Sequence, residues 1–249
     1  MSALRAGATL QLGAKLDSRR LQVDALLFDL GGTLDADGLG WSERFEALLR
    51  EQLPATTPGA MAAALAAGEQ RVLLHPRAAE LGLEEMISLH VRMQLEQLGA
   101  SSPLRAARLV KVFYEETSGA LARRRPLLER LAQRIPLGVV SNGCGNTERL
   151  LRECGLAELL HSIVDSSLAK VWKPDPRIFA PALAALGLAP GRVAMAGDRL
   201  DRDVAAAAAA GLHAIWVSGG RSLDPAHPCA PAVELLIESV DDLDPGDER

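Results

Sequence analysis

The sequence predicts an α/β fold, in which a doubly wound parallel sheet forms the core and a helical module is inserted into it. Three observations lead to this prediction. Short apolar runs alternate with helical segments over most of the chain, which is typical of parallel strands buried on both faces. Several of these runs end in polar residues, at the edge where an open α/β sheet places its chemistry. Residues 37–120 show helical periodicity throughout, although a parallel crossover needs only one helix.

Composition narrows the class of protein and its partners. The chain has 249 residues, 48% hydrophobic and 24% charged, as in an ordinary globular enzyme. A net charge of −5 offers no basic surface, so neither nucleic acid nor a membrane is expected as a partner. No apolar stretch approaches the ~20 residues that span a bilayer. The cysteines Cys144, Cys154 and Cys229 form no CxxC pair and are predicted to be free thiols in the reducing cytoplasm.

The first apolar run, residues 25–28, is predicted to be a buried strand that leads directly into Asp29. A buried carboxylate is costly without a partner, and Gly31 and Gly32 allow the backbone to turn sharply beside an anion. On these residues alone, a strand that ends in an Asx turn is an equally good interpretation. Residues 1–22 are predicted to be an N-terminal extension, either loose or added to the sheet as an edge strand.

A polar, Gly-rich hinge at residues 35–40 precedes the predicted helical cap, residues 37–120. Ser102 and Pro103 are a natural N-cap and first-turn residue for its last helix. His90 is predicted to be a core histidine of the cap, and the basic run 123–125 a solvated helix face. The expected cap helices cover residues 41–53, 59–74, 83–98 and 102 to about 117.

The remaining chain alternates helix and strand, so residues 23–36 and 121–249 are predicted to form a Rossmann-like core with right-handed crossovers. Pro181 is expected to kink the helix that contains it. The acidic tail is expected to fray. The predicted helices cover residues 127–133, 146–154, 175–186 and 201–210, and the predicted strands cover 137–141, 163–164, 192–196, 214–217 and 235–237.

Four polar positions follow one another in an informative order. Asp29 and Ser141 end apolar runs, Lys173 stands immediately before Pro-Asp-Pro, and Asp198 ends another apolar run with Asp203 five residues later. As a set, they resemble the four motifs of the haloacid dehalogenase-like hydrolase superfamily, most of whose members are phosphatases. The resemblance covers residues from about 24 to about 220. It implies an α-helical cap that is inserted after the first motif and covers the site.

The resemblance also implies roles for these residues. Asp29 would be the nucleophile that forms an aspartyl phosphate. Because its carboxylate and a phosphate dianion repel each other, a divalent cation must bridge them. Mg²⁺ is the expected cofactor, held by Asp29, the Gly31 carbonyl and Asp198. Asp203 would orient Asp198 or a bound water.

Further residues would bind the phosphoryl group of a small-molecule phosphate ester. The resemblance places Ser141 and Lys173 on the phosphoryl oxygens opposite the metal. The backbone N–H groups of Leu30, Asn142 and Gly143 would assist them. Thr33 would fix the turn below the nucleophile by hydrogen bonding. Trp41 and Arg44, just after the hinge, are the first candidates for cap residues that contact the substrate.

Gly31 departs from the family pattern. Phosphatases of the family usually carry a second aspartate there, whose general acid–base help is worth roughly 10²–10⁴ in rate. Asp35 and Asp37 are the alternative carboxylates, at a different spacing. Three interpretations stay open: a substrate with a weakly basic leaving group, a slow phosphatase, or a catalytically impaired regulator that binds a phosphorylated metabolite or protein. The Gly197-Asp198 pair with Asp203 disfavours a dehalogenase.

Overall fold

The computed structural model describes residues 10–14 and 17–244, and its core is a six-stranded parallel sheet in the order β5-β4-β3-β6-β7-β8. β3 lies in the middle, paired with β4 on one side and β6 on the other. The predicted strands and the doubly wound α/β fold are confirmed. The strands are β3 (Ala25–Phe28), β4 (Leu137–Ser141), β5 (Ser162–Asp165), β6 (Val193–Gly197), β7 (His213–Val217) and β8 (Leu235–Ile237).

The sheet is covered on both faces, which explains why its strands are apolar without alternation. Leu26 and Phe28 of β3 pack into one hydrophobic cluster, whereas Ala25 and Leu27 pack into a second one on the opposite face. The first cluster includes residues of α4 (Pro103–Ala132) and α5 (Thr147–Glu153), and the second includes residues of α7 (Ala180–Leu186) and α8 (Ala205–Ala210). A short helix, α6 (Ser166–Ala169), follows β5.

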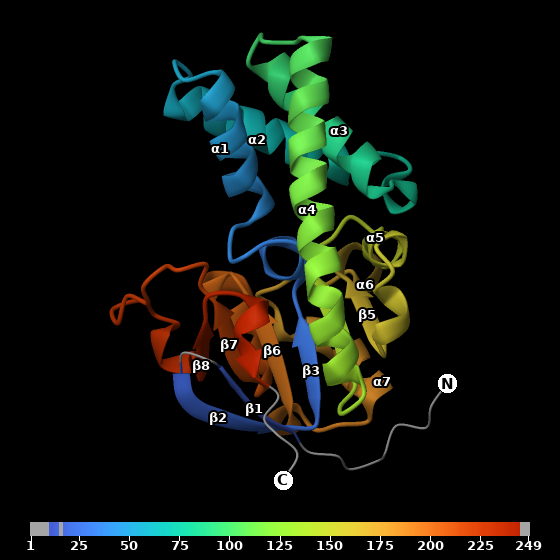
Figure 1. The fold of residues 1–249 in the computed structure, drawn as a ribbon, viewed down its shortest axis with the longest axis vertical. Helices are drawn as coiled ribbons and strands as arrows, with labels where there is room; N and C mark the ends of the chain where they lie inside the picture. The colour runs from blue at the N-terminus through green and yellow to red at the C-terminus, as the bar shows by residue number, and fades with distance from the viewer. Residues whose placement is uncertain (1–9, 15–16, 245–249) are drawn as a thin grey trace.

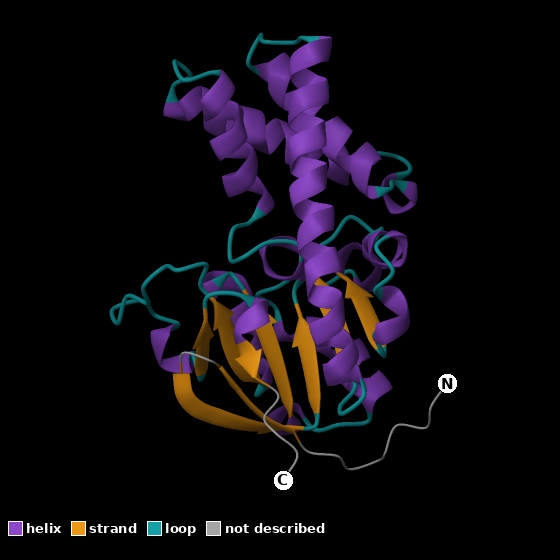
Figure 2. Ribbon diagram, viewed as in Figure 1, coloured by secondary structure: helices purple, strands orange, loops and turns teal. Residues whose placement is uncertain are grey.

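The cap stands above the carboxyl ends of the strands and consists of helices alone, as Figures 1 and 2 show. Thr57 and Ser102 accept hydrogen bonds from backbone N–H groups of the helices that they precede, each of which has proline in its first turn. The predicted helix starts are therefore confirmed there. The cap helices are α1 (Trp41–Gln52), α2 (Pro58–Leu73), α3 (Leu83–Gln97) and the first part of α4.

α4 is a single helix of 30 residues that runs from the cap down along the core (Figure 1). The sequence predicted two separate helices here, and that prediction is wrong. Thr117 and Arg124 are polar but buried, so they continue the inward face of the helix between Phe113 and Leu128. Pro126 lies inside the helix, where packing outweighs the loss of one backbone hydrogen bond. Pro181 lies in the first turn of α7 and does not kink a longer helix.

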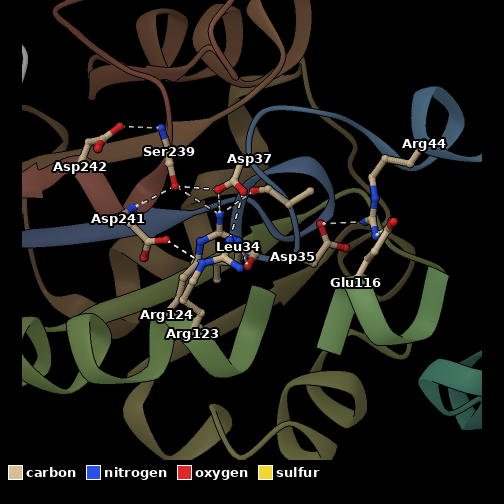
Figure 3. A network of polar contacts seen from close by, with 11 residues as sticks. Leu34, Asp35, Asp37, Arg44, Glu116, Arg123, Arg124, Ser239, Asp241 and Asp242 are labelled. Atoms are coloured by element: carbon tan, nitrogen blue, oxygen red, sulfur yellow. Dashed lines mark hydrogen bonds and ion pairs between the residues drawn. The ribbon is translucent and has the colours of Figure 1, made fainter. Parts of the chain in front are cut away.

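The prediction that the basic run 123–125 is a solvated helix face is wrong for Arg124, because its side chain is 0% exposed. It donates to the carbonyls of Leu34 and Ala36 and to Asp37, in the linker that leads from β3 to the cap (Figure 3). Arg123 is half exposed and pairs with Asp37 and Asp241. The linker is thus fastened to α4, which belongs to both the cap and the core.

The described N-terminal residues, 10–14 and 17–23, do not extend the main sheet. β1 (Leu10–Ala14) and β2 (Asp17–Val23) form an antiparallel hairpin, to which β9 (Leu243–Asp244) adds a third strand. The tail is therefore ordered as far as Asp244, and the rest of the expected frayed end lies outside the described residues. None of the helices in the described part of the chain has the length and apolarity needed to cross a membrane.

Candidate active site

The parallel pairing of three strands brings the predicted site residues to one edge of the sheet. Asp29 follows β3, Ser141 ends β4 and Asp198 follows β6. They line a cavity of about 260 Å³ between the core and the cap. Of the residues proposed from the sequence, the cavity is lined by Asp29, Leu30, Gly31, Asp35, Trp41, Ser141, Asn142, Gly143, Lys173, Asp198 and Asp203.

Lys173 occupies the centre of the charged group at the bottom of the cavity. Its Nζ lies 2.7 Å from Asp29 Oδ1 and 2.6 Å from Asp203 Oδ1, and it donates to the Val140 carbonyl at 2.9 Å. Burial lowers the pKa of Lys173, but Asp203 and Asp29 outweigh this and leave the pKa raised. Lys173 is therefore charged, and it stabilises two carboxylates that are largely buried.

Asp198 lies against the turn that follows β3. Thr33 Oγ1 donates to Asp198 Oδ1 at 3.3 Å, so Thr33 supports an acid of the site from below the turn. Gly32 has a φ of 88°, and a Cβ there would lie 2.6 Å from Asp198 Oδ2, so this position requires glycine. Asp198 Oδ2 is buried and has no hydrogen-bond partner among the described residues.

The three carboxylates form a group with the composition of a divalent-metal site. Oxygen atoms of Asp29, Asp198 and Asp203 lie within 4.8 Å of one another. Burial raises the pKa of Asp29 to about 6, against the effect of Lys173. Burial and the charge of Asp29 raise the pKa of Asp198 to about 8. A cation held by oxygen ligands would relieve this repulsion and give Asp198 Oδ2 a partner, so these residues fit Mg²⁺.

Asp203 was expected to orient Asp198 or a bound water, and its contacts among the described residues are with other groups than Asp198. Besides its ion pair with Lys173, it accepts a hydrogen bond from the Arg199 N–H at 2.9 Å. No contact with Asp198 is formed among the described side-chain hydrogen bonds. Asp203 thus positions Lys173 and the loop after β6.

Asn142 has a structural function that sequence reasoning missed. Its Nδ2 donates to the Lys173 carbonyl at 3.0 Å, and its Oδ1 accepts from the Lys173 N–H at 2.9 Å. The side chain therefore ties the lysine loop to the end of β4. Asp165 was missed as well: it accepts hydrogen bonds from Gly145 N–H and Thr147 and shapes the same loop. Its position directly at the end of an apolar strand was the available signal.

Gly31, unlike Gly32, has room for a side chain. Its φ is −73°, and a Cβ there would make ordinary contact with Trp41, 3.6 Å from Cδ1. Of the two alternative acids, Asp37 is bound to Arg124 in the linker and does not line the cavity. Asp35 lines the cavity, but its oxygens accept from Gly32 N–H and from the Trp41 indole.

The two candidate cap residues differ in their positions. Trp41 lines the cavity, whereas Arg44 does not belong to its lining. Arg44 lies over the Phe113 ring, 4.1 Å from its centroid, and donates to Thr117 Oγ1 at 2.8 Å. Arg44 therefore joins α1 to α4 within the cap.

Known proteins resemble this chain both in sequence and in fold. Residues 23–211 match the haloacid dehalogenase-like hydrolase family. The chain is 36% identical over 144 residues to the phosphoserine phosphatase of Thermus thermophilus, and the aligned segment covers 54% of this chain and 55% of that protein. It is 30% identical over 142 residues to the glyceraldehyde 3-phosphate phosphatase of Methanopyrus kandleri, covering 54% and 60%. The matches thus span little more than half the length of these relatives.

Two solved structures share the fold. The L-2-haloacid dehalogenase RSc1362 superposes with a TM-score of 0.57 at 19% identity, covering 88% of this chain and 96% of that one. The HAD-hydrolase YfnB of Bacillus subtilis, described as bound to magnesium, has a TM-score of 0.52 at 18% identity, covering 88% and 96%. At these identities the likeness concerns the fold alone. The family match over residues 23–211 includes the ends of the three strands that carry the site. The chain therefore belongs to the haloacid dehalogenase-like hydrolases.

Proposed function

We propose that this protein is a Mg²⁺-dependent phosphatase that hydrolyses a small phosphorylated metabolite through an aspartyl phosphate at Asp29. The observation that carries the proposal is the charged group at the cavity floor: Asp29 is held by Lys173 within a buried set of three carboxylates. The names of the relatives, phosphoserine phosphatase and glyceraldehyde 3-phosphate phosphatase, support the reaction class. The three free cysteines support the reducing cytoplasm as its location.

The magnesium ion would be held by Asp29, Asp198 and the Gly31 carbonyl, with Asp203 nearby. When bound, it supplies positive charge that lets a phosphate dianion approach the Asp29 carboxylate. The unpartnered Asp198 Oδ2 and the raised pKa values of Asp29 and Asp198 favour this assignment. Thr33 keeps the other Asp198 oxygen in place.

In the first step, an Asp29 oxygen forms a bond to phosphorus while the bond from phosphorus to the ester oxygen breaks. Ser141 and Lys173 stabilise charge on the phosphoryl oxygens, with help from the backbone N–H groups of Leu30, Asn142 and Gly143. In the second step, water attacks the phosphorus, and the Asp29 carboxylate and inorganic phosphate are released. With glycine at position 31, the departing oxygen takes its proton from solvent or leaves as a weak base.

Turnover of an activated ester tests this proposal. The protein should hydrolyse p-nitrophenyl phosphate in the presence of Mg²⁺, because this leaving group needs little protonation. Asp29→Asn should abolish the activity. Asp201→Asn, which alters an exposed carboxylate outside the cavity lining, is the matched control and should keep it. Activity that persists in Asp29→Asn would place the nucleophile elsewhere.

Gly31 supports a second candidate function, a protein that binds a phosphorylated ligand or partner without turning it over. In that case a phosphate mimic such as tungstate should bind in the presence of Mg²⁺, while no phosphate ester is hydrolysed. A dehalogenase would instead release halide from 2-haloacids. We expect none, because the metal-type acids Asp198 and Asp203 are both present and buried.

A further inference from the structure

The cavity has two chemically different ends. The charged residues described above form the floor, which belongs to the core. The opposite end, here called the cap chamber, is built from the cap helices and is mostly apolar. Its lining includes Phe45 of α1, Leu65 and Val72 of α2, Met86 of α3 and Leu121 of α4. A phosphate bound at the floor would therefore direct the rest of its ester into this chamber.

The cap chamber contains no cation. Among the described cavity-lining residues that the cap supplies there is no lysine or arginine, and the charged ones are Glu43 and Glu69. The two arginines that line the cavity, Arg199 and Arg202, come from the core, in the segment that follows β6. His90 is neutral at physiological pH, because burial lowers its pKa to about 4. Its ring stacks on Phe45 with the centroids 5.2 Å apart. A second anionic group that lay among the cap residues, and not beside Arg199 and Arg202 of the core, would lose its hydration without gaining a counter-charge.

One polar side chain that the cap supplies to the cavity has an oxygen that lacks a hydrogen-bond partner in the described part of the chain, which indicates a ligand. Gln94 of α3 lines the cavity, its side chain is 1% exposed, and its Oε1 has no hydrogen-bond partner among the described residues. The close approach of α2 at Gly68 holds it, since a Cβ at Gly68 would lie 3.0 Å from Gln94 Nε2. A buried carbonyl oxygen without a donor is unfavourable, so a donor on the substrate would be bound with selectivity.

We propose that the substrate's leaving group is an uncharged, largely apolar alcohol with one hydrogen-bond donor, which Gln94 Oε1 accepts. This inference rests on the proposed phosphatase function and names its substrate class. The cavity of about 260 Å³ is smaller than the ~300–1,000 Å³ of drug-sized sites, so the alcohol is small. Phosphoserine, whose leaving group carries an ammonium and a carboxylate, is a poor substrate in this proposal, in contrast to what the name of one relative states.

Four phosphate monoesters test the inference: 5-hydroxypentyl phosphate, pentyl phosphate, phosphoserine and p-nitrophenyl phosphate. With Mg²⁺, kcat/KM should be about tenfold higher for hydroxypentyl than for pentyl phosphate, as for one buried hydrogen bond. Phosphoserine should be at least about tenfold worse than pentyl phosphate. Gln94→Leu should bring the hydroxypentyl-to-pentyl ratio close to one. Gln97→Leu, an exposed glutamine of the same helix, is the matched control and should leave that ratio unchanged.

The introduction of a positive charge provides an independent test. Leu65→Lys places a flexible cation in the cap chamber at a half-buried position, so phosphoserine should gain relative to pentyl phosphate. The inference is wrong if the unaltered protein prefers phosphoserine, or if Gln94→Leu keeps the hydroxypentyl preference. Dissociation constants of the same esters, measured by calorimetry, separate the two proposals. If no ester is hydrolysed but hydroxypentyl phosphate binds more tightly than pentyl phosphate and phosphoserine binds most weakly, the phosphatase function is rejected and the proposed ligand class is kept. If the order of the Kd values is reversed, the ligand class is rejected.

Discussion

The ammonium group of Lys173 lies 2.7 Å from Asp29 Oδ1, and both side chains are buried beneath the cap. Asp203 flanks the same ammonium at 2.6 Å. This arrangement makes the lysine a structural requirement of the site as well as a candidate phosphate ligand, because it is the cation that keeps neighbouring buried carboxylates together.

Lys173→Met should therefore destabilise the metal-free protein by about 3–5 kcal/mol, the usual effect of removing one partner from a buried ion pair. Urea denaturation with and without Mg²⁺ measures it. Added Mg²⁺ should restore part of the loss, because a divalent cation can replace the missing charge. Equal stability of variant and unaltered protein in the chelator EDTA would contradict the role of Lys173.

Asp198→Asn should weaken the binding of Mg²⁺ by at least about tenfold and weaken a phosphate mimic with it. The fold should be intact. The metal-free variant should be no less stable than the metal-free unaltered protein, because asparagine replaces a carboxylate whose pKa is raised to about 8 by burial and by Asp29. Calorimetric titration gives the affinity and circular dichroism the fold. Unchanged Mg²⁺ affinity would remove Asp198 from the site.

Gly31→Asp should change the kinetics in a specific way. In the unaltered protein, an activated ester should give a burst of about one leaving group per site, because phospho-Asp29 forms faster than water cleaves it without a base. In the variant the burst should be smaller and the steady rate up to ~10²-fold higher, because the new carboxylate can act as the base for the attacking water. The backbone at position 31 has room for this side chain beside Trp41.

Rapid-quench kinetics, combined with the mass of the intact protein, would detect the phosphorylated species. Gly31→Ala is the matched control, because it fills the same space without a carboxylate. A linear time course without a phosphorylated species, together with a Gly31→Asp variant no faster than the unaltered protein, would show that another group supplies the base.

The Arg124 contacts predict a strong asymmetry between neighbouring arginines. Arg124→Met should destabilise the protein by about 2–5 kcal/mol, because it leaves the buried carbonyls of Leu34 and Ala36 without their donor, while Asp37 is half exposed and keeps other donors. Arg123→Met, next to it but half exposed, should cost about 1 kcal/mol or less. Thermal or urea denaturation of both variants checks this, and similar losses for the two would contradict the assignment.

His90 should give the stability a pH dependence. Its pKa is lowered to about 4 in the folded protein by burial, against an ordinary value of 6.5. The unfolded chain therefore binds the proton more readily, so this contribution is fully present above pH 6.5 and is lost as the pH falls toward 4. The loss should be on the order of 2 kcal/mol, because the ring is only partly buried.

Denaturation of His90→Leu at pH 7.5 and 4.5 should show a smaller difference than the unaltered protein shows. His161→Leu, at an exposed site, is the matched control and should not reduce that difference. A slope that is the same in all three proteins would assign the pH dependence to other groups.

The sequence by itself determined the succession of the six core strands along the chain and the edge of the sheet at which the polar motif residues gather. Strand β3 could be predicted because four buried apolar residues in a row are a local signal, and Asp29, Ser141 and Asp198 because each stands at the end of such a run. In a parallel sheet these ends lie at one edge, and the neighbouring positions of β4, β3 and β6 in the sheet bring the three side chains together. The roles assigned to them stay predictions.

Only the tertiary structure decided which polar residues are buried and what they contact. Arg124 is charged and stands among other arginines, so no local pattern reveals that its partners are the linker carbonyls 88 and 90 residues away. The single helix α4, the sheet formed by β1, β2 and β9, and the bonds from Asn142 to Lys173 depend on similar long-range contacts. The same holds for Gln94. The free energy of a polar side chain depends on whether a partner is present where it is buried, and that is a property of the folded chain.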